Sequence, residues 1–91
     1  MDFIWDTAKR QINLKKHRLD FADAERVCSG ETFTFEDDRF AYGQQRFISM
    51  GLLRGDVIII VHAETEETIR IISMRRAEKH EQRLYFSNLS S

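Results

Sequence analysis

Residues 57–74 read VIIIVHAETEETIRIISM, two apolar runs separated by a polar segment, and this stretch decides the fold class. The first run, Val57 to Ala63, has an uninterrupted apolar centre, which is typical of a strand buried on both faces of a sheet. Thr65-Glu66 supplies a turn before the second run, Thr68 to Met74. The stretch therefore predicts two neighbouring antiparallel strands in the middle of a sheet.

Strand signals continue upstream of this pair. Arg46 to Leu53 is a third β-prone run, and Arg54-Gly55 is the turn that joins it to the next strand. Thr32 to Phe35 is short and is followed by the acidic triplet at 36–38, which indicates an edge strand and then a loop. We predict a small antiparallel sheet of about four strands.

Helix signals flank the sheet on both sides. Asp6 is suited to cap a helix from about Thr7 to His17, and Asp20 is suited to cap a second helix that ends near Gly30. A last helix is predicted from about Met74 to Tyr85. The order of two helices, a sheet and a helix predicts an α+β fold, and the 91 residues are expected to form one domain, 1–91.

Composition excludes several classes of protein. The chain is 42% hydrophobic and 32% charged with a net charge of -1, so it is neither a disordered tail nor a nonspecific polyanion binder. Its one cysteine, Cys28, cannot form an internal disulfide, and the longest apolar run, Val57 to Val61, is too short to span a membrane. No His or Cys pair has metal-ligand spacing and the four glycines are scattered, so we expect no metal and no other cofactor. The expected location is the cytoplasm.

The end of the last predicted strand concentrates positive charge. Arg70 lies within apolar sequence, where a guanidinium needs a partner. Ser73 is a candidate cap for the last helix, which would place Arg75 and Arg76 in a first turn whose dipole disfavours cations. Such an arrangement predicts a bound anion. The alternative, given equal weight, is that Arg70 pairs with an acidic neighbour and that the other two arginines are solvated.

Three patches of the chain share the pattern of one family. The first patch consists of Phe3-Ile4-Trp5-Asp6, Lys9, Asn13, Lys16-His17, Phe21, Ala24 and Val27. The second consists of Tyr42-Gly43-Gln44-Gln45-Arg46 and Gly51, and the third consists of residues Ile69 to Arg75 with Ala77 and Glu81. Together they extend from residue 3 to about residue 85, and in this order and spacing they resemble the BrnT ribonuclease toxins of bacterial type II toxin-antitoxin modules.

The resemblance implies a RelE-like fold and a metal-independent endoribonuclease that cleaves RNA. It also implies inhibition by a cognate BrnA-type antitoxin, a DNA-binding protein encoded alongside, so that operator DNA is reached only through the antitoxin and no membrane is involved. One position departs from the family, which usually has Glu where this chain has Gln44. Because Gln cannot take a proton, the alternative is a weak or silent member that acts as antitoxin partner and co-repressor.

Five residues are candidates for metal-independent RNA cleavage. Arg70 and Arg75, with Arg46 across the sheet, can present guanidinium donors to phosphate oxygens. His17 titrates near neutral pH and can give or take a proton, and Lys16 can hold a phosphate or lower the pKa of the base. Replacement of Arg75 by Ala is expected to slow cleavage and, from its place in a helix start, to leave the melting temperature nearly unchanged.

Each candidate has a structural alternative. His17 is suited to a helix C-cap, and Arg46 can pair with one of the acids at 36–38. Trp5 can stack on a base, but an aromatic before a helix cap more often packs on the core. Cys28 is expected in the core, and neither His62 nor His80 has a catalytic neighbour in the sequence.

Overall fold

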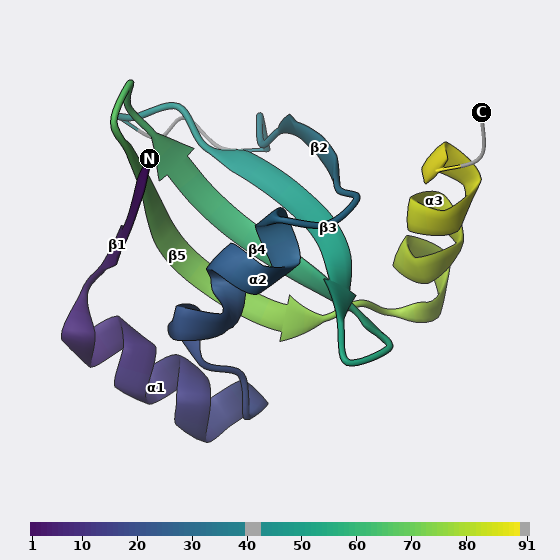
Figure 1. The fold of residues 1–91 in the computed structure, drawn as a ribbon, viewed down its shortest axis with the longest axis horizontal. Helices are drawn as coiled ribbons and strands as arrows, with labels where there is room; N and C mark the ends of the chain where they lie inside the picture. Colours follow the sequence, from purple (N-terminus) through teal and green to yellow (C-terminus); the bar gives the residue numbers. More distant parts are fainter. Residues whose placement is uncertain (40–42, 90–91) are drawn as a thin grey trace.

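The computed structural model describes residues 1–39 and 43–89, which form an α+β fold around one five-stranded sheet (Figure 1). The strands are β1 (Asp2–Trp5), β2 (Phe33–Glu36), β3 (Phe47–Leu53), β4 (Asp56–Glu64) and β5 (Thr68–Arg76). The helices are α1 (Thr7–His17), the 3₁₀ turn η1 (Phe21–Asp23), α2 (Ala24–Cys28) and α3 (Lys79–Leu89). The predicted α+β class and order of helices around a sheet are confirmed, whereas the prediction of about four antiparallel strands is wrong. In the described part of the chain, no helix is long and apolar enough to cross a membrane.

The missed strand is β1, and it makes the sheet mixed. The sheet order is β1-β5-β4-β3-β2, with β2 to β5 forming an antiparallel meander. β1 pairs in parallel with β5, so that Ile4 lies opposite Arg70 and Trp5 lies opposite Ile71. Because β1 has four residues and leads directly into a helix cap, it carries too little periodic signal to be identified without its distant partner.

The hairpin between β3 and β4 confirms the turn predicted at Arg54-Gly55. Leu53 lies opposite Asp56, which leaves a two-residue loop. Both loop residues have positive φ, 49° at Arg54 and 87° at Gly55, as a type I′ turn requires. The next strand, β4, is buried from Val57 to Ile60, which agrees with the prediction of a strand covered on both faces.

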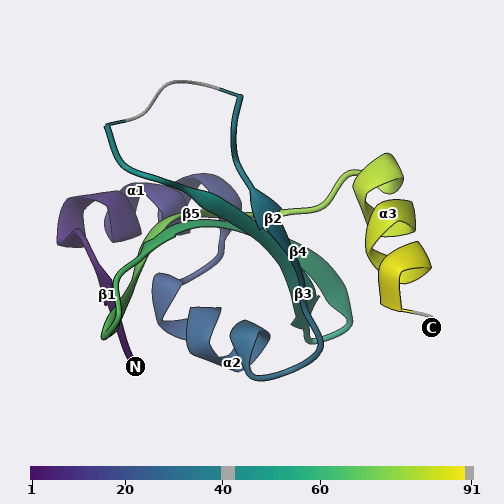
Figure 2. The same cartoon turned by 90° about the horizontal axis from the view of Figure 1, so that it is seen from above.

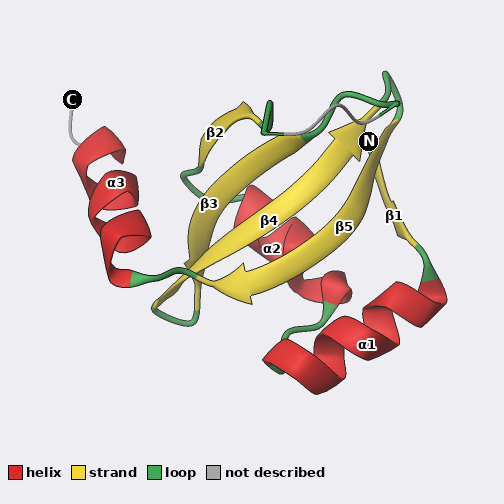
Figure 3. Cartoon of the chain, turned by 180° about the vertical axis from the view of Figure 1, so that it is seen from behind, coloured by secondary structure: helices red, strands yellow, loops and turns green. Residues whose placement is uncertain are grey.

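The two faces of the sheet carry separate cores, because successive residues of a strand point to opposite sides. The first face packs against η1, α2 and the segment before them, and its core residues are Leu19, Phe21, Ala24, Val27, Leu53, Ile58, Ile60, Ile71 and Met74. The second face packs against α3, and its core residues are Ile48, Met50, Val57, Ile59 and Tyr85. Figure 2 shows α2 and α3 on different sides of the curved sheet, and Figure 3 views the second face with α2 behind the strands.

The end of β5 contradicts the prediction of a helix that begins near Met74 with Ser73 as its cap. Residues 74–76 continue the strand and pair with residues 58–60 of β4, and α3 begins at Lys79. Although Met, Arg and Ala favour helix locally, the ladder with a buried central strand outweighs this preference. The helix start that suggested an anion site at Arg75 and Arg76 is therefore absent, because both residues lie in β5.

α1 lies along β5 beyond the point where β1 ends, and it covers that part of the strand edge. The buried Asn13 side chain joins the two elements, because its Oδ1 accepts the Met74 N–H at 3.1 Å while its Nδ2 donates to the Leu19 carbonyl at 3.1 Å. Arg76 adds a second link by donating from Nη1 to the His17 carbonyl at 2.8 Å. These contacts fix the C-terminal end of α1 beside the end of β5.

Candidate active site

Strand β5 places Arg70 and Arg75 on the second face of the sheet. Ile69, Ile71 and Met74 contact the core of the first face, so the arginines beside them point to the opposite side. The pairing with β4 shifts by one residue between these arginines, because Val61 lies opposite Ser73 and His62 lies opposite Ile71. Ile72 is therefore the extra residue of β5, and Arg70 and Arg75 keep the same side of the sheet although five positions separate them. Arg70 lies opposite Ala63 and Arg75 lies opposite Ile59. Measured along β4, where these partners are four residues apart, the two arginine backbones are about 13 Å apart, at about 3.3 Å for each strand residue.

Arg70 is held by a neutral partner. Its Nη2 donates to Oε1 of Gln44, in the segment that leads into β3. Arg70 is half-buried and Gln44 is exposed. Among the described residues, no carboxylate forms an ion pair with Arg70, so the predicted alternative of an acidic partner finds no support there. Because an amide carries no net charge, this guanidinium retains its full positive charge beside solvent.

Arg75 is held by a carboxylate. Its Nη1 and Nη2 each lie 2.7 Å from one of the two Oε atoms of Glu81, in the first turn of α3. Glu81 also accepts the Glu78 N–H at 2.8 Å. The Arg75 hydrogen bonds lower the pKa of Glu81 to about 2, and the same bonds raise the pKa of Arg75. Arg75→Ala is therefore expected to lower the melting temperature, contrary to the prediction from a helix start, because Arg75 lies in a strand and connects it to α3.

Arg46 lies close enough to Asp37, one of the three acids in its structural alternative, for its charge to act on that carboxyl. The Asp37 side chain has no exposed surface, and the Arg46 charge helps to lower the pKa of its carboxyl. The backbone N–H of Asp37 donates to the Arg46 carbonyl at 2.8 Å. The main cause of that lowered pKa is Arg39, whose Nε and Nη2 donate to Asp37 at 2.7 and 3.0 Å. Arg39 was not among the residues predicted from the sequence, since its place after the acidic triplet pointed to an ion pair but not to the carboxylate that would be buried. Its charge also acts on Arg75 and opposes the raised pKa there.

His17 and Lys16 line a groove of about 210 Å³ between α1 and β5. Its other lining residues are Lys9, Ile12, Asn13, Ile72 and Ser73. Partial burial, followed by the charges of Lys16, Arg75 and Arg76, lowers the pKa of His17 below its ordinary value of 6.5. A lowered pKa favours the neutral imidazole, which is the form able to accept a proton. The C-cap residue of α1 is Arg18, with φ of 59°, so the side chain of His17 is not required for capping.

The structure thus divides the predicted residues into two groups. His17 and Lys16 lie near the end of β5, where the Arg75 charge reaches the imidazole. Arg70 lies at the other end of the strand with Gln44, and Arg46 immediately precedes β3.

The remaining side chains singled out in the sequence have structural roles. Trp5 packs against the core of the first face and lies under the Arg10 guanidinium, 5.8 Å from the ring centroid, and Cys28 packs on the same core as predicted. His62 is buried, and its Nε2 lies 2.7 Å from Ser49 Oγ. Within residues 1–39 and 43–89, no group of three His, Cys, Asp or Glu side chains is arranged to hold a metal ion.

Comparison with known families gives one result. The chain matches, over residues 5–81, the family described as "Ribonuclease toxin, BrnT, of type II toxin-antitoxin system". A comparison with curated proteins finds no match. A ribonuclease toxin implies an RNA substrate, and a type II system implies an antitoxin protein as its partner. The match covers most of the chain, and the chain therefore belongs to the BrnT family of ribonuclease toxins.

Proposed function

We propose that this chain is an endoribonuclease toxin that cleaves RNA without a metal ion and is inhibited by a cognate BrnA-type antitoxin. The observation that carries the proposal is the groove lined by Lys16 and His17, where the charges of Lys16, Arg75 and Arg76 help burial to lower the pKa of the imidazole. Family membership supports the ribonuclease activity. The RelE-like fold and the single domain over residues 1–91 belong to the same proposal.

The proposed reaction starts with His17 as the general base. Its neutral imidazole removes the proton from a ribose 2′-hydroxyl, whose oxygen attacks the adjacent phosphorus while the bond to the 5′-oxygen breaks. The leaving oxygen takes a proton, and the products carry a 2′,3′-cyclic phosphate and a 5′-hydroxyl. General base catalysis of this kind contributes about 100-fold to 10,000-fold in rate.

Positive charge stabilises the phosphate in this proposal. Arg70, at the other end of β5 from the groove, retains its charge beside Gln44 and can donate two hydrogen bonds to phosphate oxygens of the bound RNA backbone. Lys16 acts as a point charge in the groove, and Arg46 remains a proposed contributor beside Asp37. Arg75 is a smaller contributor in this proposal, because Glu81 occupies two of its donors and offsets its charge.

The proposal is tested by cleavage of a defined RNA in excess EDTA, with mapping of the product ends. Cleavage that persists and leaves cyclic phosphate ends supports the proposed chemistry. Loss of cleavage on chelation with recovery on adding a divalent ion contradicts it. Induction of the chain in a bacterium should also arrest growth, and co-expression of the antitoxin should restore it.

A second function is favoured by one observation, the amide of Gln44 at a position where the family usually has an acid. In this alternative the chain is catalytically silent and serves as the antitoxin's partner in a co-repressor, reaching operator DNA only through the antitoxin. Normal growth and intact RNA at high expression, together with tight antitoxin binding, would support the silent protein and remove the enzyme.

A further inference from the structure

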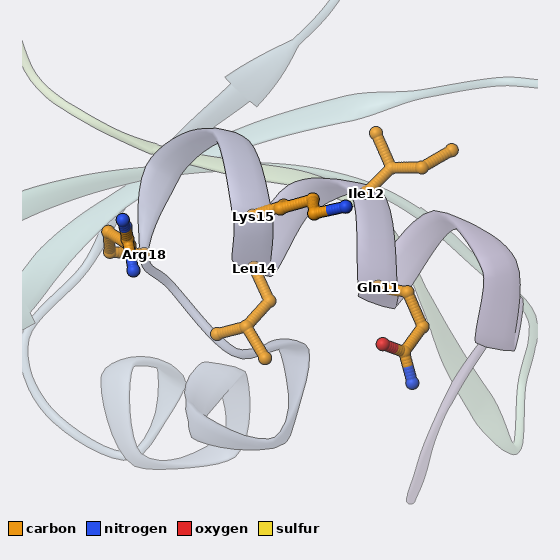
Figure 4. A pocket seen from close by; sticks show the side chains of 5 residues that line it. All are labelled: Gln11, Ile12, Leu14, Lys15 and Arg18. Carbon is orange, nitrogen blue, oxygen red and sulfur yellow. The ribbon is translucent and has the colours of Figure 1, made fainter.

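The solvent-facing surface of α1 combines apolar and cationic side chains in one shallow pocket. This pocket, of about 370 Å³, is lined by Gln11, Ile12, Leu14, Lys15 and Arg18, which we call the α1 surface (Figure 4). Ile12 is 64% exposed and Leu14 is 40% exposed. In Figure 4 the Lys15 side chain extends along the helix toward Ile12. Apolar side chains therefore lie within reach of cations on a face that remains exposed among residues 1–39 and 43–89.

The charge of this surface is local and uncompensated. α1 carries Lys9, Arg10, Lys15 and Lys16 but no acidic residue, whereas the whole chain has a net charge of -1. Arg10 is neutralised by Asp20, with N–O distances of 2.8 and 2.9 Å. Among the ion pairs of the described residues, none involves Lys15 or Arg18.

The helix dipole explains part of this arrangement, since cations stabilise the C-terminal turn of a helix. It does not explain why Ile12 and Leu14 are exposed among them. A single exposed aliphatic side chain is ordinary, but two in one cationic pocket match a ligand that is both apolar and acidic. RNA fits less well, because bases stack on aromatic rings and this pocket offers aliphatic side chains.

We propose that the α1 surface is the docking site for a segment of the antitoxin partner in which carboxylates flank apolar side chains. The apolar side chains cover Ile12 and Leu14, and the carboxylates pair with Lys15 and Arg18. Ile12 lines both this pocket and the neighbouring groove of Lys16 and His17. A segment that crosses Ile12 therefore also closes the groove to RNA, and this second consequence rests on the proposed function.

The test measures antitoxin affinity for the full-length chain and for two variants on the α1 surface. We expect Leu14→Ser to weaken the complex about ten-fold or more, because it removes an apolar anchor. Lys15→Glu should slow association and reduce its dependence on salt. The matched controls lie on α3, where Leu84 is 41% exposed and Arg83 is also exposed, so Leu84→Ser and Arg83→Glu should leave the affinity unchanged.

A second measurement keeps the result independent of the enzyme. Hydrogen exchange should show added protection of the second half of α1 in the antitoxin complex, whether or not the chain cleaves RNA. The free Leu14→Ser and Lys15→Glu variants should retain wild-type cleavage, because neither residue lines the groove. Failure of the proposed function would appear as absent cleavage in every variant while antitoxin affinity still responds to Leu14.

Four outcomes would overturn the docking site. Unchanged affinity in both α1 variants, or equal losses in the α3 controls, would place the antitoxin elsewhere. A loss of RNA binding in Lys15→Glu with unchanged antitoxin affinity would assign the surface to RNA. A change of oligomeric state in Leu14→Ser, with unchanged antitoxin affinity, would assign it to a second copy of the chain.

Discussion

Arg70 and Arg75 lie on the same face of one strand, but their partners differ in charge. Arg70 donates to the amide oxygen of Gln44 in an exposed segment, whereas Arg75 forms two hydrogen bonds of 2.7 Å with Glu81, whose side chain is 15% exposed. A neutral partner orients a guanidinium and leaves its charge for an incoming anion. A carboxylate partner uses both the donors and the charge. The comparison supports the proposed phosphate-binding role of Arg70, and it shows that Arg75 connects β5 to α3.

The largest expected effect is on cleavage by Arg70→Ala. Removing a placed charge from the phosphate should lower the rate about 100-fold to 1,000-fold, while the melting temperature changes little because only an exposed hydrogen bond is lost. The measurement is single-turnover cleavage of a defined RNA. Arg83→Ala, which removes an exposed arginine from α3, is the control. Wild-type cleavage by Arg70→Ala would end the proposed role of this arginine.

The next effect concerns stability in Arg75→Ala. Loss of the bidentate partner leaves Glu81 mostly buried and unpaired, so the free energy of unfolding should fall by about 1–2 kcal/mol after allowance for the exposed part of Arg75. For a domain of this size, each kcal/mol corresponds to about 4–8 °C in melting temperature. Cleavage per folded molecule should fall less than in Arg70→Ala. A stable but inactive Arg75→Ala variant would reverse the roles assigned to the two arginines.

Acid unfolding tests the same ion pair through its acidic residue, Glu81. Because the folded-state pKa of Glu81 is about 2 rather than 4.5, its contribution is complete above about pH 4.5 and is lost as the pH falls toward 2. Glu81→Gln should therefore lower the free energy of unfolding at neutral pH. It should also make that free energy fall less steeply between pH 4.5 and pH 2, as measured by urea unfolding at several pH values. Asp20, whose pKa is also lowered to about 2 by Arg10, keeps part of the slope in both proteins. An unchanged slope in Glu81→Gln would show that the pair is weak in solution.

Gln44→Glu would give Arg70 the kind of partner that Arg75 has. We expect a gain in cleavage of about three-fold to ten-fold, with an added ionisation in the pH profile, because a carboxylate can accept a proton that an amide cannot. The gain is limited because His17 already supplies a base in the proposed reaction. Gln45→Glu is the matched control, since its exposed side chain contacts Glu36 and not Arg70. A slower Gln44→Glu enzyme would mean that neutralising Arg70 outweighs any help with proton transfer.

The smallest effect is a displacement of the pH profile by Lys16→Gln. The charge of Lys16 helps to lower the pKa of His17, so its removal should raise that pKa and move the acid limb of the cleavage profile to higher pH. Lys15→Gln, one residue away and not among the causes of the shift, should leave the limb in place. An equal shift of the acid limb in both variants would show that the net charge of the protein, rather than the position of Lys16 in the groove, determines the pKa of His17.

The sequence was enough to predict which types of residue form the candidate site, but not how they are arranged. Adjacent lysine and histidine at a predicted helix end were enough to propose a basic, titratable site, because helix ends are marked locally. The partners of the two arginines were not predictable, since Gln44 and Glu81 meet them only through the register of β5 and the position of α3. Arg39 was missed for the same reason, because the acidic triplet offered three carboxylates and only the fold buries Asp37.

The sequence by itself determined the elements that local physical chemistry specifies. A capping Asp6 defined α1, Arg54-Gly55 matched a two-residue turn, and the apolar run in β4 marked a strand buried on both faces. Tertiary structure decided that residues 74–76 are strand and that residues 2–5 form a fifth strand. Both outcomes depend on backbone hydrogen bonds to distant segments and on side chains buried against them. Local preferences, worth fractions of a kcal/mol per residue, are overridden where those contacts form.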